Sequence, residues 1–265
     1  MNSSDLLGPQ GPFAVCEGYE YRPAQLHMAQ IVEDVLAHKG IAFVEAGTGT
    51  GKTLGYLVPA LLSHKRVIVS TGTKTLQDQI MQNELPRIEQ TLGIETNAVC
   101  MKGLSNYVCL RKFHEFSQVA TAGSAFENDM KLITQWVEGS HTGDHSELSS
   151  LPENSEVFPH VTSSSETRIG PSCIFHDQCF VTRLKSAAQA AQLIVVNHHL
   201  FFANLAMGGH QINSIIPPYD AVIFDEAHQI EDVMTQYFGT HISMRRVDLL
   251  CHEIRKTFAL TESFP

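Results

Sequence analysis

The sequence predicts an α/β domain built on a parallel sheet that helices cover on both faces. Four short runs are continuously apolar, at residues 41–44, 67–69, 193–196 and 221–224. Segments in which apolar residues recur at helical spacing, such as 24–38, alternate with these runs. Strands of a parallel sheet are buried on both faces and therefore lack the polar–apolar alternation of a half-exposed strand.

The elements follow one another in a regular order. Residues 1–20 contain Gly and Pro without a helical or strand period, and we interpret them as a loose leader. A glycine-rich loop separates the first predicted strand from the helix after it, and the pattern turns helical again near the end of the chain. The predicted helices are 24–38, 52–63, 75–85 and 247–258, and the predicted strands are 41–44, 66–70, 96–100, 193–196 and 221–224.

The composition excludes some classes of protein. With 265 residues, of which 43% are hydrophobic, the chain can form a sizeable core, which argues against wholesale disorder. A formal net charge of −10 argues against a surface coated with nucleic-acid-binding charge. Local basic patches are still present, and each is either a binding patch or an ordinary solvated face. They are Lys102 with Arg111 and Lys112, and Arg183 with Lys185.

No targeting segment is evident in the sequence. No run of 18 apolar residues is present, and Met1 to Gln10 lack the charged start and apolar core of a signal peptide. We therefore expect a cytoplasmic protein without a membrane partner. Its six cysteines then lie in a reducing compartment, where metal ligation or plain burial is expected rather than disulfide formation.

Residues 101–192 interrupt the alternation of strands and helices. Within them, 138–172 are rich in Ser, Thr, Gly, Glu and His and have no helical or strand period. The stretch also contains Cys109, Cys173 and Cys179. We interpret 101–192 as an insertion between strands of the α/β unit, formed partly of loops.

Residues 46–53 (AGTGTGKT) match the phosphate-binding loop pattern, with a predicted strand before them and a predicted helix after them. Their three glycines let backbone N–H groups surround an anion without interference from a Cβ. The N-terminus of the helix adds partial positive charge. We expect Lys52 to reach the β- and γ-phosphates of ATP and the Thr53 hydroxyl to bind Mg²⁺.

Asp225 and Glu226 supply the acidic partner of this loop because they directly follow the apolar run 221–224. In the phosphate-loop template such an aspartate holds Mg²⁺, and the glutamate beside it polarises the attacking water. By itself the pair also fits a solvated acidic turn. His228 is placed to sense the γ-phosphate, with a surface or capping histidine as the alternative.

Both motifs together resemble superfamily 2 helicases of the DEAH type. Residues 22–25 (RPAQ) resemble the family's segment before the phosphate loop, whose glutamine reads adenine. Residues 70–79 (STGTKTLQDQ) resemble motif Ia, which grips the DNA backbone. Residues 102–109 (KGLSNYVC) and 196–201 (VNHHLF) resemble the entry to and the exit from an iron–sulfur insertion. Over about residues 19–240 the chain is similar to the DinG/XPD family of 5′→3′ DNA helicases, in particular its bacterial YoaA branch.

The resemblance implies a RecA-like motor domain with a parallel sheet at 1–100 and 193–240, an iron–sulfur-type insertion at 101–192, and the start of a helical arch domain at 241–265. It implies ATP-driven translocation on single-stranded or forked DNA, with replication or repair proteins as partners. RNA helicases of the DEAH type are a weaker match, because the cysteine-bearing insertion does not suit them. The implied site residues are Gln25, Ala46, Gly47, Thr48, Gly49, Thr50, Gly51, Lys52 and Thr53 for ATP; Lys52, Asp225, Glu226 and His228 for catalysis; Thr53 and Asp225 for Mg²⁺; and Thr71 and Thr73 for DNA.

One departure from the family concerns the iron–sulfur cluster. Such clusters usually take four thiolate ligands, and Cys109, Cys173 and Cys179 match three of the family's positions. The fourth position, five residues before Cys173, holds Arg168, whose guanidinium stays protonated and cannot bind iron. Three outcomes remain open: a three-thiolate 4Fe–4S cluster, a substitute ligand, or structural thiols without a cluster. The candidate substitutes are His176 and Cys100.

A second departure concerns the motor itself. A helicase of this family hydrolyses ATP between two RecA-like domains, and the second domain supplies an arginine finger worth about 10³–10⁵ in rate in related phosphoryl-transfer enzymes. The sequence shows no second half of this kind. We therefore expect weak ATP binding and poor turnover from this chain alone. The alternative hypothesis is a truncated remnant that acts as a nucleotide- or DNA-binding module.

Overall fold

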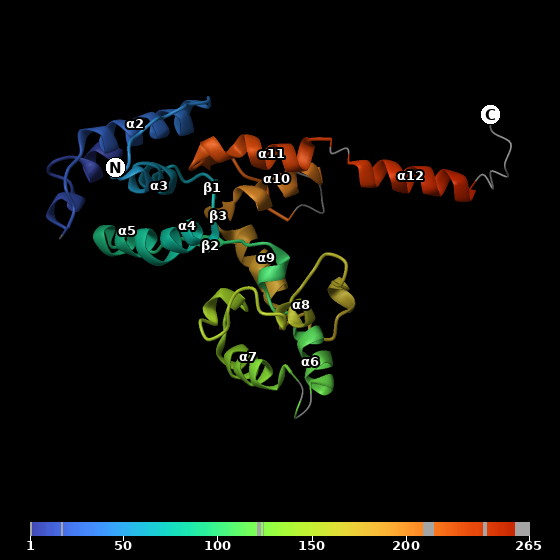
Figure 1. Ribbon diagram of the computed structural model, residues 1–265. Coiled ribbons are helices and arrows are strands. Elements are labelled where there is room, and N and C mark those ends of the chain that lie inside the picture. Colours follow the sequence, from blue (N-terminus) through green and yellow to red (C-terminus); the bar gives the residue numbers. More distant parts are fainter. Residues whose placement is uncertain are drawn as a thin grey trace, which may run out of the picture.

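The computed structural model describes residues 2–16, 18–120, 123, 125–208, 215–240 and 243–257. Its centre is a four-stranded sheet in the order β2-β3-β1-β4, in which every paired strand is parallel (Figure 1). The predicted parallel sheet is thereby confirmed. The strands are β1 (Val67–Thr71), β2 (Ala98–Cys100), β3 (Leu193–Asn197) and β4 (Ala221–Phe224).

Helices cover both faces of this sheet, as the apolar runs predict. One group of helices lies on each face, a third group forms the insertion, and α12 extends away from the body at the C-terminal side (Figure 1). The first group is α1 (Ser3–Leu7), α2 (Pro23–His38), α3 (Lys52–Leu62), α4 (Lys74–Gln79) and α5 (Leu85–Leu92). The second is α9 (Phe180–Ala190), α10 (His198–Ala206) and α11 (Ile230–Phe238); the insertion holds α6 (Leu110–Val119), α7 (Glu127–Gly139) and α8 (Phe158–Val161), and α12 spans Met244–Thr257.

Alternate side chains of each central strand enter different cores. Val67 and Val69 of β1 pack in the core shared with α1, α2, α3 and α5, whereas Ile68 packs in the core shared with α9, α10 and α11. All three are completely buried. Burying an aliphatic side chain of this size contributes about 1.5–3 kcal/mol. The strand is therefore held from both faces, which explains its continuous apolar sequence.

The prediction of a strand at 41–44 was wrong. These residues have no regular secondary structure, and Ile41 and Phe43 are 85% and 96% exposed. A strand needs a neighbour for its backbone hydrogen bonds. In the described part of the chain β4 pairs only with β1, so no strand lies beside 41–44 to complete it. Apolar composition alone does not provide that partner.

The N-terminal segment is not the loose leader that its composition suggests. Helix α1 is closed by a capping box between Asn2 and Asp5. Leu6, Leu7 and Phe13 are no more than 1% exposed and belong to the core of α2 and α3. The prediction failed because the apolar residues of this segment are scattered among Gly and Pro and show no period.

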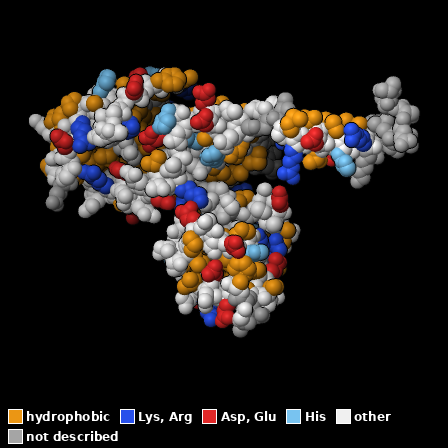
Figure 2. Space-filling model, viewed as in Figure 1, with side chains coloured by type: hydrophobic (Ala, Val, Ile, Leu, Met, Phe, Trp, Pro, Cys, Tyr) orange, Lys and Arg blue, Asp and Glu red, His pale blue; other side chains and the backbone are white. Residues whose placement is uncertain are grey.

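The insertion forms a lobe that projects from the sheet-bearing body (Figures 1 and 2). It has its own core, which includes Phe113, Ile133 and Phe158. The division at residues 100 and 193 stays a prediction. None of the helices in the described ranges combines the length and apolar character needed to cross a bilayer.

Lys102 joins the insertion to the body through a buried ion pair. Its ammonium lies 2.8 Å from Asp78 Oδ1 on α4 and 2.8 Å from Asp144 Oδ2 in the insertion, and it donates to Ser146 Oγ at 3.0 Å. The residue is 4% exposed, so placing it in a surface basic patch was wrong. Burial lowers the pKa of Lys102, but hydrogen bonds to Asp144 and Asp78 outweigh that effect and leave the pKa raised.

We predict that Lys102→Met destabilises the chain by about 3 kcal/mol, because it leaves two carboxylates near each other without their cation. Urea unfolding followed by circular dichroism measures the change in the free energy of unfolding. The matched control is Lys131→Met, which removes an exposed lysine from an i,i+4 pair with Glu127 and is expected to cost about 0.5 kcal/mol or less. Equal effects of the two substitutions would contradict the prediction.

Candidate nucleotide-binding site

Residues 46–53 form an open turn at the N-terminus of α3. Gly49 and Gly51 have φ of +78° and +77°, a left-handed conformation that side-chain-bearing residues rarely adopt. Gly51 is the N-cap of α3, and no side chain occupies the helix N-terminus. Thr50 Oγ1 donates to Gly47 O at 2.8 Å, and Lys52 Nζ donates to Ala46 O at 3.4 Å. The loop thus leaves backbone N–H groups at the start of α3 available to an anion.

Helix α2 supports this loop from behind. Gln25 is 3% exposed; its Nε2 donates to Gly51 O at 2.8 Å, and its Oε1 accepts from the Tyr19 hydroxyl at 2.8 Å. Arg22 donates to Gly49 O. A Cβ at position 51 would lie 2.1 Å from Gln25 Nε2. In this structure the glutamine expected at adenine therefore holds the phosphate loop in place.

The acidic pair lies at the end of β4, beside the loop. The Asp225 N–H donates to Ser70 O at 2.8 Å, which continues the β1–β4 ladder by one residue. Glu226 has φ of +54°, a left-handed conformation that costs a residue with a side chain roughly 1–2 kcal/mol. Glu226 Oε1 lies 3.8 Å from Lys52 Nζ, so the structure brings the loop lysine and the acidic turn together.

His228 lies at the outer side of the same turn. Its Nδ1 is 3.4 Å from Glu226 Oε2, and its side chain is 70% exposed. The histidine is therefore close to the acidic pair and open to solvent.

Sequence reasoning missed Tyr56, which connects α3 directly to the acidic pair. Its hydroxyl donates to Asp225 Oδ2 at 3.2 Å, and the residue is 1% exposed. Burial, followed by the charge of Asp225, raises the pKa of Tyr56 well above its usual range, so the hydroxyl remains a donor. The sequence feature that could have pointed to it was a tyrosine in an apolar helix, one turn after Thr53. Its partner is distant in sequence and could not be inferred.

The two threonines expected at DNA differ in accessibility. Thr71 is completely buried, and its Oγ1 donates to Thr73 O at 3.1 Å. Thr73 is exposed, and its Oγ1 accepts from Leu76 N as the N-cap of α4. Only Thr73 therefore presents side-chain atoms at the surface.

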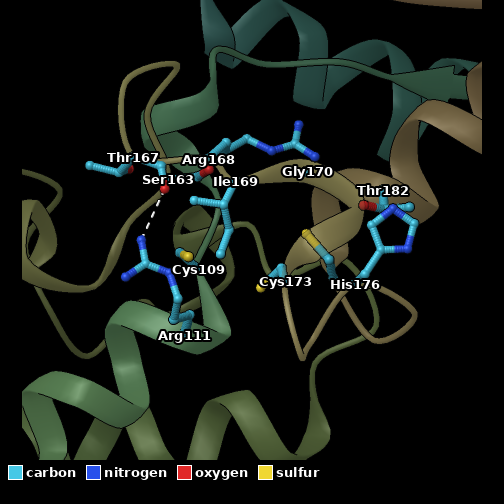
Figure 3. A pocket seen from close by; sticks show the side chains of 11 residues that line it. Cys109, Arg111, Ser163, Thr167, Arg168, Ile169, Gly170, Cys173, His176 and Thr182 are labelled. Atoms are coloured by element: carbon cyan, nitrogen blue, oxygen red, sulfur yellow. Dashed lines mark hydrogen bonds between the residues drawn. The ribbon is translucent and has the colours of Figure 1, made fainter.

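A pocket in the insertion gathers the three cysteines of the expected cluster (Figure 3). Cys109, Cys173 and Cys179 line it, together with Arg168 and His176. Arg111 lies at its edge and donates to Thr167 O at 2.9 Å. The structure thus brings together the three cysteines that the family resemblance suggests as cluster ligands. It places Arg168 among them.

These side chains do not form a metal-binding arrangement. Among the residues that the structure describes, no three His, Cys, Asp or Glu side chains converge on a point where a metal ion could bind. The candidate substitute His176 instead lies 3.3 Å from Asp177 Oδ1. Cys100 is on β2 and contacts the Gln77 amide at 3.5 Å, and burial raises its pKa to about 12. The arrangement present does not fit a four-thiolate cluster.

The loop, the acidic pair and the parallel sheet have the arrangement expected of a phosphate-loop nucleotide-binding domain. Residues 23–136 match the DEAD/DEAH box helicase family. The chain is similar to the ATP-dependent DNA helicase YoaA of Haemophilus influenzae, with 38% identity over 239 residues, covering 90% of this chain and 37% of that protein. YoaA of Escherichia coli is 38% identical over 256 residues, covering 95% of this chain and 40% of that protein.

A third relative is the protein called 3′-5′ exonuclease DinG in Bacillus subtilis, 31% identical over 226 residues, which are 84% of this chain and 24% of that protein. The chain therefore carries a DEAD/DEAH box helicase domain, and its similarity to YoaA and DinG is consistent with the N-terminal part of a DinG-type helicase. It spans well under half the length of these curated relatives.

We predict that the chain, purified anaerobically, holds far less iron than four atoms per molecule, because Arg168 occupies the place of a thiolate ligand. Arg168→Cys should raise the iron content several-fold and add visible absorbance. Iron analysis and absorption spectra measure both effects. The control Arg183→Cys adds a thiol beside Phe180, outside the residues that line the pocket, and should change neither. A full complement of iron in the unchanged chain would contradict the prediction.

Proposed function

We propose that this chain binds ATP with Mg²⁺ and forms the first motor domain of an ATP-dependent DNA helicase. The observation that carries the proposal is the meeting of the phosphate loop with the acidic turn: Lys52 Nζ lies 3.8 Å from Glu226 Oε1. These residues are 174 positions apart in the sequence, and a parallel sheet brings them to one edge. Ligands of open α/β sheets bind at that edge.

Each group at this edge suits one part of a Mg²⁺–triphosphate complex. The free N-terminus of α3 and Lys52 would bind the phosphates. Thr53 and Asp225 would hold Mg²⁺, which neutralises phosphate charge when bound. Glu226 would orient the attacking water as general base. His228 would contact the γ-phosphate. Gln25 would contribute to ATP binding by holding the phosphate loop in place.

We further propose that the whole protein moves 5′→3′ along single-stranded DNA and unwinds forked DNA in the cytoplasm, with replication or repair proteins as partners. The relatives named as ATP-dependent DNA helicases support this. The exposed Thr73 at the end of β1 is the proposed DNA contact. The proposed division is a RecA-like motor at 1–100 and 193–240, the insertion at 101–192, and the start of an arch at 241–265, supported by the separate core of the insertion.

The resemblance also suggests a 4Fe–4S cluster in the insertion. Because the thiols and Arg168 do not fit four-thiolate ligation, we assign the cluster no role in the activity of this chain. The cysteine pocket would serve there as packing around the segments that precede α6 and α9.

The second candidate is a nucleotide- or DNA-binding module without useful turnover. It is favoured by the exposure of the site, because Lys52 and Glu226 side chains are 31% and 33% accessible and no described element covers them from the other side. Extending the chain downstream by a second motor domain separates the candidates. DNA-stimulated ATPase activity should rise about 10³-fold or more on extension if the added domain supplies an arginine finger.

We predict that Lys52→Ala lowers the affinity of the chain for Mg²⁺–ATP at least tenfold, because it removes the cation that faces the phosphates. Titration with a fluorescent ATP analogue up to millimolar concentration measures the dissociation constant. Lys131→Ala, which changes an exposed lysine in the insertion, is the control and should bind like the unchanged chain. Unaltered binding by Lys52→Ala would show that the phosphate-loop assignment is wrong.

A further inference from the structure

His198 is a completely buried histidine that the mechanism above does not use. It begins α10, immediately after β3, and its Nδ1 lies 2.7 Å from Ser70 Oγ at the end of β1. Its Nε2 is buried and has no hydrogen-bond partner. A buried ring nitrogen without a partner is uncommon, because desolvation is then uncompensated.

The ring lies beneath the acidic turn of β4. Its centroid is 6.1 Å from that of Phe224, the residue before Asp225. Burial lowers the pKa of His198, and interactions of the ring with the backbone of Asp225 and Glu226 partly offset that effect, although neither has the geometry of a formed hydrogen bond to Nε2. The net effect keeps the imidazole neutral, with one nitrogen donating and the other accepting. The imidazole ring therefore lies close to the backbone of the turn.

Ser70 connects the histidine to the same turn by a second route. Its hydroxyl pairs with His198 Nδ1, and its carbonyl accepts from the Asp225 N–H at 2.8 Å. Ser70 is completely buried and stands between Val196 of β3 and Phe224 of β4 in the strand register. Three adjacent strand ends thus meet around one imidazole.

The turn that they surround is strained. Glu226 is one of three non-glycine residues with positive φ among those described, and such strain persists only where the surroundings hold it. On its other side, Gln229 packs against Gly72, where a Cβ would lie 2.5 Å from Gln229 Oε1. The turn is therefore bonded to β1 through Ser70, and the unpartnered Nε2 of His198 lies near it at the start of α10.

We propose that His198 is a positioning residue of the nucleotide site, which donates from Nε2 to the backbone of the Asp225–Glu226 turn when Mg²⁺–nucleotide binds. The Ser70 hydroxyl donates to Nδ1 and so places the proton on Nε2. Nε2 has no hydrogen-bond partner in the structure, and a small movement of the turn on nucleotide binding would give it one. This inference rests on the proposed ATP site and assigns to that site a support from the start of α10.

The test separates the two ring nitrogens by substitution. His198→Asn places an amide near the position of Nδ1 and keeps the contact with Ser70, whereas His198→Gln extends an amide toward the position of Nε2. Nucleotide affinity of the 265-residue chain is measured with Mg²⁺ and with EDTA. We expect His198→Asn to weaken Mg²⁺-dependent binding about fivefold or more and to leave binding in EDTA unchanged. His198→Gln should bind within about twofold of the unchanged chain, as should the control His199→Asn, which alters the exposed neighbour.

Equal Mg²⁺-dependent affinity of His198→Asn and the unchanged chain overturns the inference, and so does an equal loss with and without Mg²⁺. If the unchanged chain and Lys52→Ala both fail to bind, the proposed function itself has failed. A measurement without substitution covers the case in which His198→Asn does not fold. Ring-nitrogen NMR of the unchanged chain should show a proton on His198 Nε2 that becomes protected from exchange when Mg²⁺–ATP is added. An unprotonated Nε2, or one unaffected by the nucleotide, overturns the inference as well.

Discussion

The pairing of β1 with β3 on one side and β4 on the other is the constraint on which the rest of the structure depends. Because all three strands are parallel, their carboxyl ends lie at one edge of the sheet. That edge holds the acidic turn after β4, the Thr71–Thr73 segment after β1 and the buried His198 after β3. The phosphate loop reaches the same edge through α3. A shift in register of either pair would separate these groups.

Buried polar contacts then decide how the parts of the chain are joined. Tyr56 links α3 to Asp225, and Lys102 links α4 to the insertion through Asp78 and Asp144. Each is a charged or polar group that is stable in the interior only with its partners in place. The body and the insertion have separate apolar cores, and the buried Lys102 ion pair joins them together with the more exposed pair of Lys74 and Glu153. Movement of the insertion would therefore shift α4 through the Lys102 ion pair. Helix α4 directly follows the segment that is proposed to contact DNA.

The cysteine pocket shows how one residue changes the chemistry available to a group of thiols. Three thiols line the same pocket, so the fold still brings the expected positions together. Arg168 among them supplies a permanent cation where a thiolate would be needed. The core of the insertion consists of aromatic and aliphatic residues other than those that line the pocket.

The sequence by itself determined the parallel sheet, the phosphate loop and the acidic pair, because these depend on local order: a continuous apolar run, glycines at set spacing, and two carboxylates at a strand end. Only the tertiary structure decided that 41–44 is exposed, that Gln25 supports the loop, and that Lys102 is buried. It alone paired Tyr56 with Asp225 and Ser70 with His198, across 169 and 128 positions. Contacts at such separation follow from the order of strands in the sheet, and no local pattern in one sequence records that order.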